Sequence, residues 1–204
     1  MLKGLQHFKT ITYHKYLVMK GCFSVGLYWQ GICHDLSKYT PTEFWVGARY
    51  YQGNRSPNNA EREDKGYSAS WLHHKGRNKH HYEYWLDYSV KEIEGGMAPA
   101  PMPVKYILEM MMDRIAAGKV YAGKSYTHHN PLRYYIGGRD DAPLHEKTRQ
   151  QMELFLLILD KYGEKEMIRF MKKKVLPYKK QWDHPKTWRR LTEGFMKKYQ
   201  VSID

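Results

Sequence analysis

The neighbouring histidine and aspartate in residues 31–44, GICHDLSKYTPTEF, are side chains whose types could do chemistry together. His34 and Asp35 are adjacent, and Lys38 follows three residues after Asp35. Imidazole nitrogens and carboxylate oxygens are both ligands for transition metals. A polar pair that ends a helix and hydrogen-bonds to loop backbone would have the same composition. The pair therefore predicts a metal site only if further nitrogen and oxygen ligands occur elsewhere in the chain.

Histidines supply such ligands in unusual number. The chain contains eleven, and five of them fall between residues 34 and 81. Residues 71–85, WLHHKGRNKHHYEYW, contain two histidine pairs, His73 with His74 and His80 with His81. Neighbours on one helix point about 100° apart, so we expect one ligand from each pair, and the choice within each pair stays open.

The candidate metal ligands are nitrogen and oxygen donors with no thiolate among them. In chain order they are His14, His34, Asp35, His74 with His73 as its alternative, His80, His81 and Asp113. Structural zinc sites are commonly rich in sulfur, so this set favours one or two catalytic ions of iron, manganese or zinc. Asp113 directly follows three methionines, which indicates partial burial, and a buried carboxylate needs a cation. Its alternative is a surface helix position with a salt bridge.

The order of these residues resembles the HD superfamily of metal-dependent phosphohydrolases, which are all-α proteins with a His, His-Asp, Asp arrangement. Members with two metals have further histidines between the His-Asp pair and the last Asp. HDLSK is similar to the HD-x-x-K form of the cyclic-dinucleotide phosphodiesterases, but GRNKHH stands where their HHE and G-x-G-Y-P signature would be. More narrowly, HDLSKYTPTEF, WLHHKGRNKHHYEYW and MMMDRIAAGKVY resemble a family of uncharacterised bacterial and phage proteins over roughly residues 5–160.

The resemblance implies roles for individual residues. Asp35 would bridge two ions, and Lys38 and Arg77 would offset the charge on a substrate phosphate; solvent-facing side chains are the alternative for the latter two. Glu43 is expected to be only the capping carboxylate of a helix. Tyr126, His128 and His129 could line a pocket mouth, although a loop tip is the more common place for such a sequence. Met110–Met112 are expected to pack in the core.

The elements that must position these residues are predicted to be helices, so the fold class is all-α, an HD-domain-like bundle of roughly six to eight helices. TPTE at 40–43 fits a helix start, because Thr40 can cap and Pro41 suits the first helical position. The predicted helices cover residues 5–20, ending at Gly21, then 23–35, 67–74, 80–94, 104–117 and 143–162, ending at Gly163, with two short basic helices after them. Residues 52–66 and 124–141 are predicted as loops, and 95–103 as a connector.

The composition suits one domain, with residues 1–163 as the metal-binding bundle and residues 164–204 as a basic extension packed on it. Net charge is +13, and residues 164–198 hold twelve Lys or Arg against four Asp or Glu. Such charge attracts nucleic acid, nucleotides or acidic surfaces, although a solvated helix face is the commoner meaning. No apolar run suggests a membrane span or a signal peptide, and two cysteines fit a reducing cytoplasm.

Three functions follow as hypotheses. The leading one is a cytoplasmic metal-dependent hydrolase of a phosphate ester, with a nucleotide as one candidate substrate. The second is a diiron oxygenase, because the same ligand cage also resembles the inositol-oxygenase branch of the superfamily. The third is a non-catalytic protein that binds nucleic acid or another anion through its basic C-terminal segment. The oligomeric state is left open.

Overall fold

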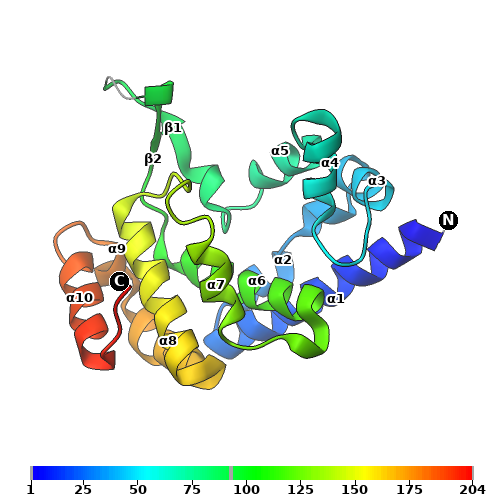
Figure 1. Ribbon diagram of the computed structural model, residues 1–204. Coiled ribbons are helices and arrows are strands. Elements are labelled where there is room, and N and C mark those ends of the chain that lie inside the picture. Colours follow the sequence, from blue (N-terminus) through cyan, green and yellow to red (C-terminus); the bar gives the residue numbers. More distant parts are fainter. Residues whose placement is uncertain (1, 92–93, 204) are drawn as a thin grey trace.

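A computed structural model describes residues 2–91 and 94–203. Helices dominate the described chain, and the β-structure is one short antiparallel pair (Figure 1). The all-α prediction is confirmed. The α-helices are α1 Leu2–Val25, α2 Tyr28–Cys33, α3 Pro41–Arg49, α4 Pro57–Lys65, α5 Ala69–Lys75, α6 Val104–Ala122, α7 Asn130–Ile136, α8 Glu146–Phe170, α9 Lys179–Asp183 and α10 Trp188–Tyr199. The strands are β1 Leu86–Tyr88 and β2 Met97–Pro99, and 3-10 turns include η1 Leu36–Tyr39 and η2 Tyr82–Trp85.

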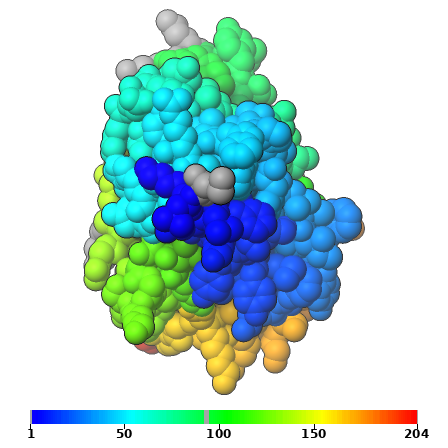
Figure 2. Space-filling view, turned by 90° about the vertical axis from the view of Figure 1, so that its right-hand side faces the viewer, coloured from blue at the N-terminus to red at the C-terminus, as the bar shows by residue number. Residues whose placement is uncertain are grey.

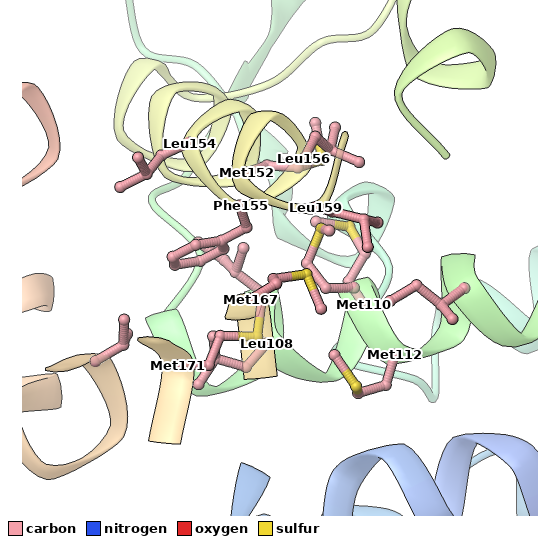
Figure 3. Close-up of a cluster of buried hydrophobic side chains, with 14 of the residues drawn as sticks. Leu108, Met110, Met112, Met152, Leu154, Phe155, Leu156, Leu159, Met167 and Met171 are labelled. Carbon is pink, nitrogen blue, oxygen red and sulfur yellow. The ribbon is translucent and has the colours of Figure 1, made fainter. Parts of the chain in front are cut away.

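The core lies where α6 and α8 pack against each other and against the C-terminal segments. Figure 3 shows leucine, phenylalanine and methionine side chains from these elements in one cluster. The segment of α8 from Met152 to Leu159 is buried throughout, as its apolar sequence predicts. Met110–Met112 on α6 are also buried, which confirms that they pack in the core. This core fixes α6, the helix that carries Asp113.

Helix α1 packs along α6 and is longer than predicted. It passes through Gly21 and ends at Val25, before Gly26 takes a φ of 106°. The predicted end at Gly21 is wrong because this glycine serves helix packing: a Cβ there would lie 2.9 Å from the Met112 sulfur. Figure 2 shows α1 in blue on the surface of one face, beside the light blue and cyan segments that follow it.

Several other element predictions are corrected by the structure. The predicted helix 23–35 is interrupted at residues 26–27 and stops at Cys33. Residues 52–66 are not all loop, because α4 forms after Ser56 with Pro57 at its first position. The predicted helix 80–94 is instead η2 followed by β1, and residues 92–93 of it lie outside the described residues. Helix α6 continues five residues past 117, and α7 lies within the predicted loop 124–141.

The C-terminal segments join the same core. Gly163, with a φ of 78° and a ψ of 173°, is not helical, so the first part of α8 stops at this glycine as predicted, and a second helical stretch follows to Phe170. Trp182 on α9 is fully buried and stacks on Phe195 of α10. The domain division predicted at 163/164 falls at this break in α8, and it stays a prediction. Within residues 2–91 and 94–203, no helix combines the length and the apolar character that crossing a membrane requires.

Candidate metal centre

Two long helices and one turn assemble the first group of ligand atoms. His14 is buried on α1, and its Nε2 lies 2.9 Å from Asp113 Oδ1 on α6. His34 and Asp35 come from the turn between α2 and η1, and His34 Nε2 lies 3.3 Å from Asp35 Oδ2. One ligand atom from each of these four residues lies within 4.8 Å of all the others. The candidates that the sequence placed farthest apart, His14 and Asp113, are therefore brought together.

The backbone at Asp35 explains how adjacent residues serve one site. His34 is extended, with a ψ of 127°, and Asp35 is left-handed, with a φ of 53° and a ψ of 26°. In a continuous helix the two side chains would diverge by about 100°. The turn lets the imidazole and the carboxylate meet instead, and it is the reason why the predicted helix through Asp35 is not formed.

The second group of ligand atoms shares Asp35 with the first. It consists of Asp35, His74, His80 and His81, again with one atom from each within 4.8 Å of the others. His74 Nε2 lies 3.2 Å and His80 Nε2 3.4 Å from Asp35 Oδ1. Nε2 of His81 lies 2.9 Å from Nε2 of His74. The expectation of one ligand from His80 and His81 assumed that both residues lie on one helix. In the structure they precede η2 and are not helical, and both lie in this group.

The donor atoms at the centre fit a metal ion. Nε2 of His14, His34 and His80 and both carboxylate oxygens of Asp35 are buried, and none has a partner with hydrogen-bond geometry, although Asp113 lies close to His14 and Lys38 lies close to Asp35. Orphaned buried polar atoms are costly unless something else satisfies them. All of these atoms carry lone pairs when the rings are neutral and the carboxylate is ionised, which is the form that binds metals. These buried groups could therefore hold a metal ion.

Charge leads to the same conclusion. Four carboxylates gather here, from Asp35, Glu43, Glu109 and Asp113, while Lys38 is the lysine in contact with Asp35, at 2.6 Å from its Oδ2. Burial would raise the pKa of Asp35, but the charges of His34 and Lys38 hold it well below its usual range. Burial would lower the pKa of Lys38, and Asp35 raises it instead. A divalent cation would balance the remaining negative charge.

The histidines divide by their surroundings. Burial would lower the pKa of His34, but Asp35 and the other carboxylates raise it well above its usual value. Burial and then Lys38 lower the pKa of His14. Burial and the neighbouring His80 and His74 keep the pKa of His81 well below its usual range. A low pKa keeps an imidazole neutral near pH 7, which suits a metal ligand.

Two buried carboxylates that we did not predict as site residues contact the histidines from behind. Glu109 on α6 lies beside Nδ1 of His34 and of His80, and Glu43 on α3 lies beside Nδ1 of His73 and of His74. The prediction that Glu43 only caps α3 is wrong, and the Thr40 hydroxyl donates to Ser37 O instead of capping that helix. A signal existed for Glu109, since it precedes Asp113 by one helical turn. None marked Glu43.

Four residues that were predicted to bind substrate or line a pocket lie outside the ligand groups. Arg77 is exposed, and its guanidinium donates to the His73 carbonyl oxygen. Tyr126, His128 and His129 line a hollow of about 450 Å³ together with Thr127 and Glu164. None of these residues belongs to the ligand groups. Lys38, by contrast, reaches the centre, and its side chain keeps 29% exposure.

Comparison with known proteins places the chain in a family without assigning it an activity. A model described as a family of unknown function, DUF5662, matches residues 3–157. The chain therefore belongs to this family, as the narrower sequence resemblance indicates. No curated protein and no solved structure matches the chain.

Proposed function

For this member of a family of unknown function, we propose a metal-dependent hydrolase of phosphate esters with a metal centre of the HD type. The observation that carries the proposal is the position of Asp35, whose carboxylate belongs to both groups of buried ligand atoms. A carboxylate shared between two sets of nitrogen and oxygen donors is suited to bridging two ions of iron, manganese or zinc. A nucleotide is the candidate substrate within this class.

The residues divide into two holding groups and one charge-stabilising residue. His14, His34 and Asp113 would hold one ion together with Asp35, and the histidines at 74, 80 and 81 would hold a second. Ions held there supply Lewis acidity, which acidifies water near neutral pH and stabilises negative charge on phosphoryl oxygens. Lys38 is the partly exposed cation of the centre, so its ammonium is placed to bind a phosphate oxygen of an incoming ester.

The first test removes the shared carboxylate. We expect the Asp35→Ala variant to lose hydrolysis of phosphomonoester and phosphodiester substrates assayed with added Mn²⁺, because neither ion would keep its common ligand. Elemental analysis of the same purified proteins should show about one to two equivalents of metal in the wild type, because two groups of ligand atoms share Asp35. The Asp35→Ala variant should contain less metal.

A matched control exists in the chain. His129 Nδ1 lies 2.8 Å from Asp160 Oδ1, so this pair has a similar contact outside the ligand groups. The Asp160→Ala variant should retain metal and activity. Hydrolysis that survives in Asp35→Ala at the level of Asp160→Ala would contradict the proposed function.

A further inference from the structure

Glu109 contacts two histidines that belong to different ligand groups. Its Oε1 lies 3.0 Å from Nδ1 of His34 and 3.3 Å from Nδ1 of His80. The opposite ring nitrogens, both Nε2, lie beside Asp35 at 3.3 and 3.4 Å. Glu109 also lies within reach of these two histidines as a possible ligand set. We assign it as a hydrogen-bond acceptor, because the unpartnered Nε2 atoms face Asp35 and the Nδ1 atoms face Glu109.

Glu43 makes the same kind of contact from another helix. Its Oε2 lies 2.8 Å from Nδ1 of His74, and its Oε1 lies 2.6 Å from Nδ1 of His73. Nε2 of His74 again lies on the Asp35 side, at 3.2 Å. Both glutamates are buried, with 5% exposure each. Neither belongs to the groups that contain Asp35.

We propose that Glu109 and Glu43 are positioning residues that hold His34, His80 and His74 with Nδ1 protonated and Nε2 free for a metal ion. An imidazole that donates its Nδ1–H to a carboxylate has a fixed tautomer, a fixed ring orientation and a more basic Nε2. The inference rests on the metal centre of the proposed function. It adds to that function two residues that touch neither an ion nor a substrate.

The two glutamates differ in how many of the ligand groups they contact. Glu109 holds one histidine of each ligand group, His34 of the first and His80 of the second. Glu43 holds His74, which belongs to the second group alone. Removing Glu109 should therefore lower the affinity for both metal ions, and removing Glu43 should lower the affinity for one of them. A general loss of folding would lower both affinities in both variants.

The experiment uses the full chain and zinc as the probe. Zinc dissociation constants are measured by competition with a chelator for wild type, Glu109→Gln, Glu109→Leu and Glu43→Gln. We expect Glu109→Gln to raise the constants of both ions by about 10- to 100-fold and Glu43→Gln to raise only one. In zinc-loaded protein labelled with ¹⁵N-histidine, the Nδ1-bound protons of His34 and His80 should persist in Glu109→Gln, whose amide oxygen still accepts, and disappear in Glu109→Leu.

Glu153→Gln is the control for burial. Glu153 is 6% exposed and accepts from Tyr135 and Arg139, outside the ligand groups. This variant should leave zinc affinity at the wild-type value even if it lowers the melting temperature. Wild-type zinc constants and unchanged Nδ1 proton resonances in both Glu109 variants would overturn the inference, as would equal weakening of both ions in Glu43→Gln. A wild type that binds two zinc ions but hydrolyses no phosphate ester would end the proposed function alone.

Discussion

Asp35 connects the two halves of the candidate centre, because histidines from both groups lie beside its carboxylate oxygens. Much of the site could be predicted from residue types in chain order, since the candidates at 14, 34, 35 and 113 occur in the structure as one group. Glu43 and Glu109 could not be predicted in the same way. A glutamate on a helix has many ordinary uses, and only the folded chain shows that these two face Nδ1 atoms.

A prediction at this scale separates the two cations proposed to bind a substrate phosphate. Lys38 contacts Asp35, whereas Arg77 is exposed and bonded to backbone. We expect Lys38→Met to lower kcat for a phosphate ester by about 10²- to 10³-fold, as the loss of one charge-stabilising donor does. Arg77→Met should leave kcat within about twofold, because no contact ties Arg77 to the ligand groups. Equal losses in steady-state assays of both variants would contradict this division.

His7 provides a prediction about pH. It is 6% exposed on α1, and burial, followed by Lys38, lowers its pKa from 6.5 to about 4. As pH falls below 6.5, the unfolded chain takes up this proton before the folded chain does, so the contribution to stability is lost progressively down to about pH 4. We expect His7→Gln to flatten this part of the pH dependence. Urea unfolding of both proteins at pH 7.5 and 5, with a chelator present, measures it.

The test for His7 compares how steeply the unfolding free energy changes with pH in the wild type and in His7→Gln. The other ionisable groups are the same in the wild type and in His7→Gln, so their contributions cancel in this comparison. A wild type and variant whose unfolding free energies fall in parallel between the two pH values would show that His7 is not the cause.

At the scale of elements, the predictions succeeded where apolar periodicity was strong or a proline marked the first helical position, and they failed where a glycine served helix packing instead of ending a helix. Pro41 begins α3 and Val104 begins α6, as predicted. Gly21 and Gly163 were both predicted as helix ends; Gly163 does break α8, whereas Gly21 lies inside α1 and provides space for Met112. Residues 80–94 are aromatic enough for either helix or strand, and tertiary packing decides between them.

The contact of α1 with α6 gives the corresponding prediction. Gly21→Ala gains about 1 kcal/mol of helix propensity but overpacks against Met112, which costs about 1–3 kcal/mol. We therefore expect a net loss in the free energy of unfolding. Zinc affinity should fall too, because this contact sets His14 against Asp113. Gly4→Ala, whose nearest neighbour would be Ala48 Cβ at 4.0 Å, should be neutral or stabilising. Thermal unfolding of both variants is the measurement, and a more stable Gly21→Ala would contradict the packing argument.

At the scale of the whole molecule, the net charge of +13 is compatible with a solvated surface and with a surface that binds phosphates. Lys172, Lys173 and Lys174 follow α8 and are all exposed. The hypothesis of nucleic-acid binding rests on this exposed basic segment. Sequence predicts the excess charge, but only a binding measurement tells a solvated face from a surface that contacts phosphates.

That measurement is the salt dependence of affinity for a DNA or RNA probe. If the basic segment binds phosphates, the logarithm of affinity should fall linearly with the logarithm of salt concentration. Replacing Lys172, Lys173 and Lys174 by Gln should reduce the slope by about 0.9 for each lysine that contacts a phosphate of duplex DNA. Gln at the exposed Lys3, Lys9 and Lys20 of α1 removes the same charge and should leave the slope closer to wild type. Binding that is absent or independent of salt would exclude this hypothesis.

The left-handed backbone of Asp35 has a consequence for how such a chain changes under selection. Non-glycine residues occupy that conformation at a cost of about 1–2 kcal/mol, which a glycine avoids. Within the described chain, Gln200 is the other residue besides glycines with a positive φ. Glycine at position 35 would avoid that cost, but it would also remove the carboxylate that faces the Lys38 ammonium, and a buried charge left without its partner costs about 3–5 kcal/mol. Variants screened only for survival after heating should therefore keep the aspartate, as should variants screened for the chemistry, so the two screens would preserve the same codon.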